Sequence, residues 1–181
     1  IRPEADARMQ YDRVLSSNSL AAQWARDNGL HKVITDVSRD LNLKEFDDYL
    51  AANHSIELNK EGRKVETGRN LEEDVELVSK LSPAYEQYAQ AIYGYNRKLL
   101  SEYRKAGLIS KELEDYLNKK YPKYVPINRI FEDEEAVQYL SSKQIGSVAK
   151  EKLVKKLVGS EREIRSPLYN ILENTYRAVN D

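Results

Sequence analysis

Residues 82–110, SPAYEQYAQAIYGYNRKLLSEYRKAGLIS, are the stretch of sequence that decides the fold. Ser82 before Pro83 is a typical helix start, because the hydroxyl can accept a bond from an orphan amide and proline needs no donor there. Apolar side chains then recur at alternating spacings of three and four, at Tyr85, Tyr88, Ile92, Tyr95 and Leu99. This spacing predicts a long helix over residues 83–106 that packs against other helices along this face.

A second helix is expected directly after the first. Gly107 can end the long helix, and Ser110 can cap the next one. The second arm carries Leu113, Tyr116 and Leu117 at helical spacing. The sequence therefore predicts a helical hairpin.

The rest of the chain also has the pattern of helices. Only seven glycines and five prolines interrupt it, and its apolar residues recur at three and four rather than alternating. Asn42 and Asn70 each precede a glutamate by three residues, which is the spacing of a capping box. Helices are expected over residues 3–15, 20–41 with a weak point at Gly29, 43–61, 71–81, 131–140, 150–159 and from 167.

These patterns predict an all-α fold, a helical bundle organised around the long helix and its hairpin partner. We expect one domain over residues 1–181. Its one candidate subdivision is a helical core over 1–130 followed by basic C-terminal helices over 131–181. Because the chain begins IRPEAD rather than with methionine, we expect it to be a fragment of a longer protein.

An extended segment should follow the hairpin, because Pro122 and Pro126 also disfavour helix in the residues before them. Prolines fix the backbone in advance, and tyrosine and arginine often dominate interface energies. The candidate partner-binding residues are therefore Tyr121, Tyr124 and Arg129. A second interpretation remains open, in which the segment lies across the hairpin and fills its groove with Tyr124, Val125 and Ile127.

Composition excludes several classes of protein. The absence of cysteine excludes disulfides, thiolate metal sites and cysteine nucleophiles. The 29 basic and 30 acidic residues nearly cancel, so no field of the whole molecule attracts nucleic acid. The longest apolar runs are a few residues, against about 20 for a bilayer span. We expect a soluble protein with no membrane insertion.

Catalytic and metal-binding patterns are also weak. The glycines do not cluster as a phosphate-binding loop requires. His54 and Glu57 share a helix face, but this pair alone leaves the usual coordination shell of a metal unfilled. Carboxylates cluster at Asp47–Asp48 and over residues 72–74, near first helical turns, where the helix dipole favours negative charge. We expect no catalytic residue, no metal and no cofactor.

Charge is distributed unevenly along the chain. Residues 36–86 hold 13 acidic and 7 basic side chains, whereas residues 97–129 hold 4 acidic and 9 basic ones. The basic residues suggest a surface that could neutralise phosphates. The candidate nucleic-acid-binding residues are Lys119, Lys120, Lys123, Lys152, Lys155 and Lys156. The alternative is an ordinary solvated lysine face, which the balanced total charge favours.

The order of three segments resembles a helical region of the large polyvalent proteins of bacteriophages and other mobile elements. The segments are EFDDYLAANHSIELNKEGRKVETG, then SPAYEQYAQAIYGYNRKLLSEYRKAGLIS, then YPKYVPINRI. The matching positions are Tyr49, Leu50, His54, Leu58, Asn59, Gly62, Thr67, Gly68, residues 107–110, Tyr124, Val125, Pro126 and Arg129. The resemblance covers about residues 45–130. It implies a connecting or interaction module without catalytic residues, either cytoplasmic or virion-associated and delivered to the host cell.

The sequence thus favours a non-enzymatic protein-interaction or scaffold module. Its partner would be a protein. The sequence determines neither the identity of that partner nor the oligomeric state of this chain. A nucleic-acid-binding helical domain that uses the basic surface is the alternative. An enzyme is the third hypothesis.

Overall fold

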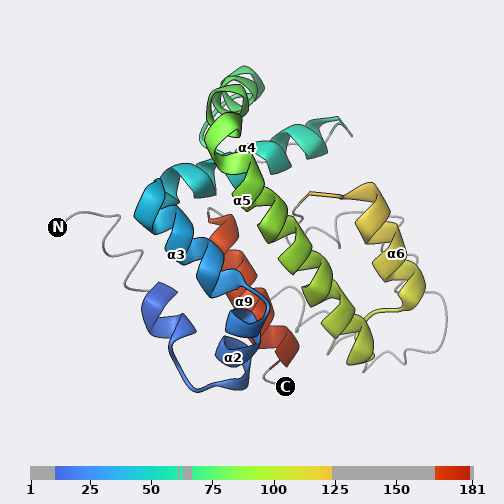
Figure 1. Ribbon diagram of the computed structural model, residues 1–181. Helices are drawn as coiled ribbons and strands as arrows, with labels where there is room; N and C mark the ends of the chain where they lie inside the picture. Colours follow the sequence, from blue (N-terminus) through green and yellow to red (C-terminus); the bar gives the residue numbers. More distant parts are fainter. Residues whose placement is uncertain (1–10, 61, 63–66, 124–165, 180–181) are drawn as a thin grey trace.

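The longest helix, α5 (Leu71–Lys105), runs through the molecule, and the other helices pack around it (Figure 1). The computed structural model describes residues 11–60, 62, 67–123 and 166–179. Residues 11–15 are helical, and the remaining helices are α2 (Leu20–Asp27), α3 (Leu30–Asp40), α4 (Leu43–Asn59), α6 (Lys111–Lys120) and α9 (Pro167–Val179). Every regular element in these described ranges is a helix, which confirms the all-α prediction.

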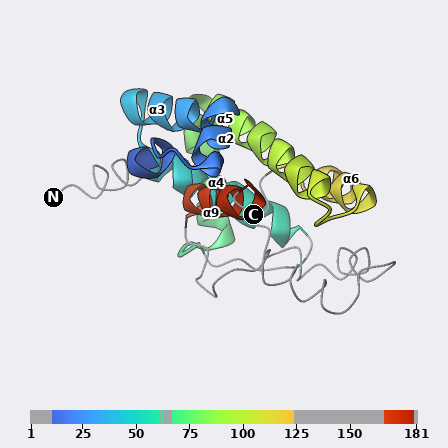
Figure 2. The same ribbon diagram turned by 90° about the horizontal axis from the view of Figure 1, so that it is seen from below.

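Helix α5 contacts α3, α4, α6 and α9, so it is the shared partner of most of the bundle. Helix α9 comes from the far end of the sequence and packs against α2, α4 and α5 (Figure 2). Among the described residues, the packing forms two apolar cores. The first includes Leu30, Phe46, Tyr85, Ile92 and Ile171, and the second includes Leu58, Leu99, Tyr103, Leu113, Leu117 and Tyr121.

The helix boundaries follow the capping residues found in the sequence. Asn42 accepts a bond from the Glu45 amide at 2.9 Å, and Asn70 and Glu73 form the complete capping box. Ser110 accepts from the amide of Leu113 at 3.1 Å and begins α6, which confirms the hairpin. Gly29 separates α2 from α3 with φ of +90°, a conformation that side chains rarely adopt.

The predicted helix start at Ser82 and Pro83 is wrong, because α5 continues through both residues. The helix has already begun at its Asn70 cap. Pro83 has no N–H, so the Ser79 carbonyl loses its backbone hydrogen bond within the helix. Because Pro83 is exposed, solvent can satisfy this carbonyl instead. In Figures 1 and 2 the first turns of α5 point in a different direction from the rest of the helix. A bend at an internal proline explains this change.

The predicted packing face of α5 is confirmed for Tyr85, Ile92, Tyr95 and Leu99, which are all buried. Tyr88 is only half-buried, against the edge of the first core. The buried surface is also wider than one seam, because α5 has neighbours on several sides. It includes the additional residues Ala89, Tyr93, Asn96, Leu100 and Tyr103.

Two buried tyrosines of α5 attach α9 to the bundle. The Tyr95 hydroxyl lies 2.6 Å from the Thr175 hydroxyl, and the Tyr103 hydroxyl donates to the Asn174 carbonyl at 2.9 Å. Each tyrosine therefore buries its ring while its polar end finds a partner. These bonds fix the position of α9 along α5.

Candidate functional site

The first three turns of α5, residues 71–82, carry the most conspicuous exposed surface of the described chain. Figure 1 shows these turns at the top of the view, beyond the other helices. Leu71 is 41 % exposed and Val75 is 49 % exposed, although both are large apolar residues. We call the surface formed by Leu71, Glu72, Val75, Glu76, Ser79 and Lys80 the α5 docking surface.

Helical periodicity places Glu72, Glu76 and Lys80 away from the core residues of α5, with Leu71 and Val75 at the boundary between the two sides. Val78 and Leu81 face inward and pack against the first core. Leu71 and Val75, one turn apart, lie next to Val78 at the edge of this inward side, and both remain exposed. The sequence predicted a helix over residues 71–81, but it could not show which of its apolar residues a neighbouring helix covers.

The α5 docking surface is acidic. Glu72 and Glu76 are exposed beside Leu71 and Val75, and neither has an ion-pair partner within the described ranges. Lys80 is the one basic residue of this surface. The result is a short apolar strip with uncompensated negative charge along it.

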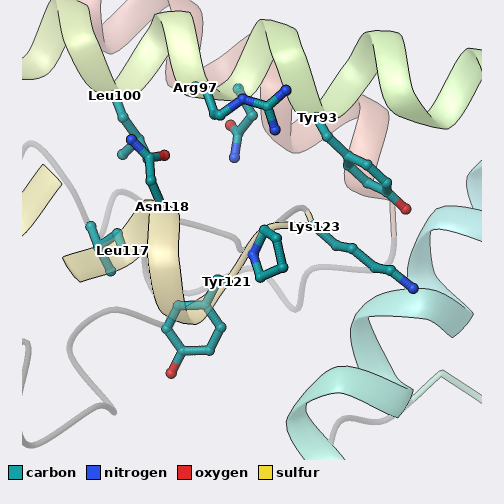
Figure 3. Close-up of a pocket in the computed structure, with 9 residues that line it drawn as sticks. Tyr93, Arg97, Leu100, Leu117, Asn118, Tyr121 and Lys123 are labelled. Carbon is teal, nitrogen blue, oxygen red and sulfur yellow. The ribbon is translucent and has the colours of Figure 1, made fainter. Parts of the chain in front are cut away.

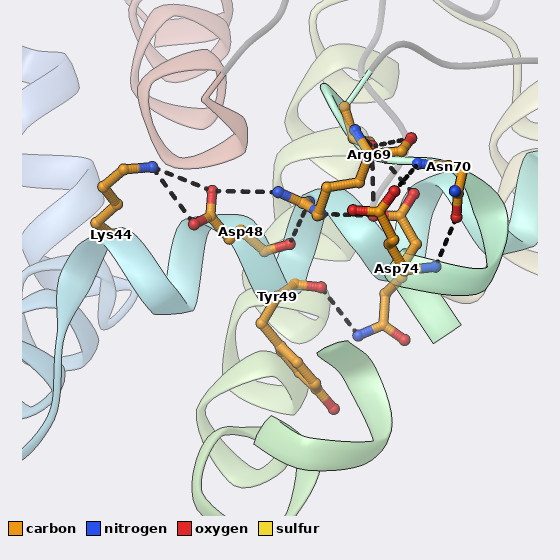
Figure 4. Close-up of polar contacts among 9 residues, drawn as sticks. Lys44, Asp48, Tyr49, Arg69, Asn70 and Asp74 are labelled. Carbon is orange, nitrogen blue, oxygen red and sulfur yellow. Dashed lines mark hydrogen bonds and ion pairs between the residues drawn. The ribbon is translucent and has the colours of Figure 1, made fainter. Parts of the chain in front are cut away.

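A polar clamp holds this part of α5 in place (Figure 4). Asp74, whose side chain is 1 % exposed, accepts from Arg69 Nε at 2.8 Å. The Thr67 hydroxyl donates to the same carboxylate at 3.0 Å. Arg69 also reaches α4, where its Nη2 donates to the Asp48 carbonyl at 3.4 Å. We call Thr67, Arg69, Asp74 and Asp48 the Arg69 clamp.

The sequence contains no pattern from which the Arg69 clamp could be predicted. Asp74 belongs to the acidic cluster that we attributed to the helix dipole, and Arg69 lies in a loop without apolar periodicity. The carboxylate is almost fully buried, so its pairing with Arg69 is required to offset the cost of removing the charge from water. The clamp therefore fixes both the loop and the direction in which α5 leaves it.

The prediction that Tyr121 is an exposed docking residue is wrong. Tyr121 is 5 % exposed and belongs to the second core, with Leu58, Leu99 and Leu117. The residue follows directly after α6 and turns back onto α5, so the hairpin covers its ring. The other two candidate partner-binding residues, Tyr124 and Arg129, lie outside the described residues.

The structure describes three of the six candidate nucleic-acid-binding lysines, and two of these three donate to neighbouring side chains. Lys119 is exposed. The Lys120 ammonium donates to the Tyr116 hydroxyl at 2.8 Å, and the Lys123 ammonium donates to Asn53 Oδ1 at 3.0 Å. Lys152, Lys155 and Lys156 lie outside the described residues.

His54, which was considered with Glu57 for metal binding, is buried on α4. Within the described ranges no group of three or more histidine, aspartate or glutamate side chains could hold a metal ion. The expectation that the chain needs no metal stays a prediction.

None of the helices in the described part of the chain combines the length and the apolar content that a membrane span requires. Comparison with protein-family models, with curated proteins and with solved structures finds no match for this chain.

Proposed function

We propose that this chain is a non-enzymatic protein-interaction or scaffold module, and that the α5 docking surface receives a basic amphipathic helix of its partner. One observation carries the proposal. Leu71 and Val75 are exposed on a helix that the Arg69 clamp holds out from the bundle. The resemblance to a helical region of large polyvalent phage and mobile-element proteins agrees with a module of this kind.

The chemistry of the surface selects the occupant. A partner helix that covers Leu71 and Val75 with apolar side chains removes about 1 kcal/mol of hydration cost per residue. This gain alone is too small for a stable complex. Lysine or arginine at the edges of the partner helix would lie near Glu72 and Glu76, which have no partner of their own among the described residues.

A second copy of this chain fits the surface less well. Two copies would bring Glu72 and Glu76 of one close to the same acidic residues of the other, with Lys80 alone to compensate. Like charges placed together in an interface are unfavourable. The exposed apolar strip also covers a small area. A standard interface buries about 800 Å² on each partner.

A titration with designed peptides tests the proposal. The probe is a synthetic amphipathic helix with leucine on one face and lysine on the other, and its matched control carries glutamate in place of lysine. We expect the lysine peptide to bind weakly, with fluorescence anisotropy reporting an affinity that falls as salt increases. The glutamate peptide should show no binding.

Two matched variants locate the binding. Val75→Glu should abolish capture of the lysine peptide, because it places a charge in the centre of the apolar strip. Leu20→Glu changes a residue that is 65 % exposed at the start of α2 and should leave capture unchanged. Equal binding by both variants, or by both peptides, would show that the α5 docking surface is not the site. Duplex DNA at low salt tests the alternative, and tighter binding to DNA than to the peptide would favour it.

A further inference from the structure

Helix α9 is joined to the bundle through the side chains that it places in the first core. These are Leu168, Ile171 and Leu172, and the hydroxyls of Tyr95 and Tyr103 on α5 add polar bonds. Among the described residues, none of the buried side chains of the second core belongs to α9. The docking of α9 therefore depends mainly on the first core.

Two buried amide groups of α9 have no hydrogen-bond partner in the structure. They are Asn170 Nδ2 and Asn174 Nδ2, on residues that are 8 % and 1 % exposed. The two asparagines are one turn apart and therefore share a face of α9. A buried donor without a partner loses its bonds to water and gains none in the protein. Docking of α9 thus has a free-energy cost that is recovered when the helix returns to solvent.

The unpartnered oxygen of Asn96 on α5 has a different explanation. Asn96 lines a cavity of about 20 Å³ between α5 and the end of α6, which Arg97 and Asn118 also line (Figure 3). This volume has room for one water molecule, which can donate to Asn96 Oδ1. Neither Asn170 nor Asn174 lines this cavity. Their buried amides therefore oppose the docking of α9 itself.

The first turn of α9 rests on a buried carboxylate of α4. Asp47 Oδ1 accepts from the Leu168 amide at 3.0 Å. Burial raises the pKa of Asp47 to about 6 from an ordinary value of 3.8, because the carboxylate is removed from water. Undocking of α9 uncovers this group and returns its pKa toward the ordinary value. The ionised carboxylate is therefore more stable in the undocked form.

The groups around Asp47 do not reverse this effect of burial. On α4, Asp48 acts in the same direction as burial, and Lys44 acts in the opposite direction. At the start of α9, the Ser166 hydroxyl and the backbone amide favour the charged form. Tyr11, in the first described helical turn, has a pKa that burial raises to about 12, so it is neutral over the working range. The net direction for Asp47 remains that of burial.

We propose that α9 is a detachable helix, which leaves α2, α4 and α5 and unfolds while the other helices stay packed, and that ionised Asp47 promotes its release. A free helix of 13 residues is marginal in water, so release and local unfolding occur together. Residues such as Leu99 and Leu113 keep their packing, because they belong to the second core. Release uncovers Tyr95 and Tyr103, so α9 controls access to this part of α5.

Native-state hydrogen exchange of the whole chain, measured by NMR at low urea concentrations, tests the proposal. The amides of Leu172 and Thr175 in α9 should exchange through a local opening that depends weakly on urea. The amides of Ile92 and Leu99 should exchange only when the bundle opens, which exposes more surface and depends steeply on urea. Equal protection and equal urea dependence at both places would show that α9 opens only with the whole bundle, and would overturn the proposal.

Two substitutions separate the causes of release. Asn174→Leu removes an unpartnered amide and should raise the protection of the α9 amides about tenfold. Asp47→Asn should raise this protection about tenfold at pH 7 and leave it unchanged near pH 3.5. The matched control is Asp115→Asn on α6, where the side chain is 62 % exposed, and it should change nothing. No rise in Asn174→Leu would contradict the role of the buried amides, and no rise in Asp47→Asn at pH 7 would contradict the role of the ionised carboxylate.

Discussion

Pro83 divides α5 into two parts that share a helical backbone and an apolar spacing but differ in burial. After Pro83, residues such as Ile92 and Leu99 are fully buried. Before it, Leu71 and Val75 keep almost half of their surface exposed. The difference comes from the neighbours, since the later part of α5 lies among several helices while the outer side of the first turns faces solvent. The same local pattern thus produces a core in one place and a surface in another.

The two parts are also held by different forces. Apolar packing and the hydroxyl bonds of Tyr95 and Tyr103 hold the later part. The Arg69 clamp holds the first turns through a buried carboxylate. Helix α4 serves both, because its adjacent residues Asp47 and Asp48 point to different sides. Asp48 contacts Arg69, and Asp47 accepts from the amide of Leu168 in α9 at 3.0 Å.

The largest expected difference between the two parts is in the cost of removing an apolar side chain. Ile92→Ala should lower the free energy of unfolding by about 2–5 kcal/mol, because it leaves a cavity in the first core. Val75→Ala should change it by less than about 0.5 kcal/mol, because the side chain is largely exposed. Urea unfolding followed by circular dichroism measures both. Similar losses in the two variants would break the comparison.

Removing the clamp should have the next largest effect. Arg69→Ala leaves the Asp74 carboxylate buried without its cation. A fully buried pair costs about 3–5 kcal/mol when broken in this way. Arg69 keeps 20 % exposure of its side chain, so we expect about 2–3 kcal/mol.

The matched control for the clamp is Arg39→Ala. Arg39 also pairs with aspartates, but its side chain is 65 % exposed. Loss of this surface pair should leave the unfolding free energy nearly unchanged, because solvent and salt screen an exposed ion pair. If both arginine variants lost the same stability, the clamp would count as an ordinary surface ion pair.

A smaller, pH-dependent effect is expected at Asp47, where burial raises the pKa to about 6 from an ordinary value of 3.8. The folded state therefore holds this proton more tightly than the unfolded state does. Stability from this group falls as the pH rises through the window between these two values and stays reduced above it. Asp47→Asn removes the charge but keeps an oxygen that can accept from Leu168.

The variant should thus be more stable than the parent chain at pH 7, by about 1–2 kcal/mol, and equal to it near pH 3.5. Urea unfolding of both chains at several pH values gives the difference between their unfolding free energies. The contributions of the other carboxylates are the same in both chains and cancel in this difference. A variant that is less stable at pH 7 would show that the charged carboxylate stabilises the start of α9 more than its burial costs.

Much of the fold could be predicted because its signals are local. Asn42, Asn70 and Ser110 each satisfy an amide a few residues away, so their positions in the sequence mark helix starts. Gly29 marks a break because its backbone conformation excludes most side chains. The spacing of Tyr85, Ile92 and Leu99 likewise identified part of the core.

The candidate sites depend on contacts between distant residues, and these have no local signal. The sequence predicted Tyr121 as a partner-binding residue. It is buried instead, because the hairpin packs its ring in the same core as Leu58 and Leu99. The unpartnered buried atoms of Tyr93 and Asn96 depend on how the neighbouring helices cover α5, which the spacing along α5 does not show. The Ser82–Pro83 pair matched a helix start, but the cap at Asn70 had already begun the helix.

The proline within α5 also has a consequence for how the helix opens. Pro83 has no amide to bond the Ser79 carbonyl, so the ladder of backbone hydrogen bonds is interrupted between the two parts. The first turns can then unfold locally without opening the bundle, and their amide hydrogens should exchange with solvent well before those around Ile92. A partner bound to these turns would slow that exchange locally, and the rest of the protein would keep its own rate.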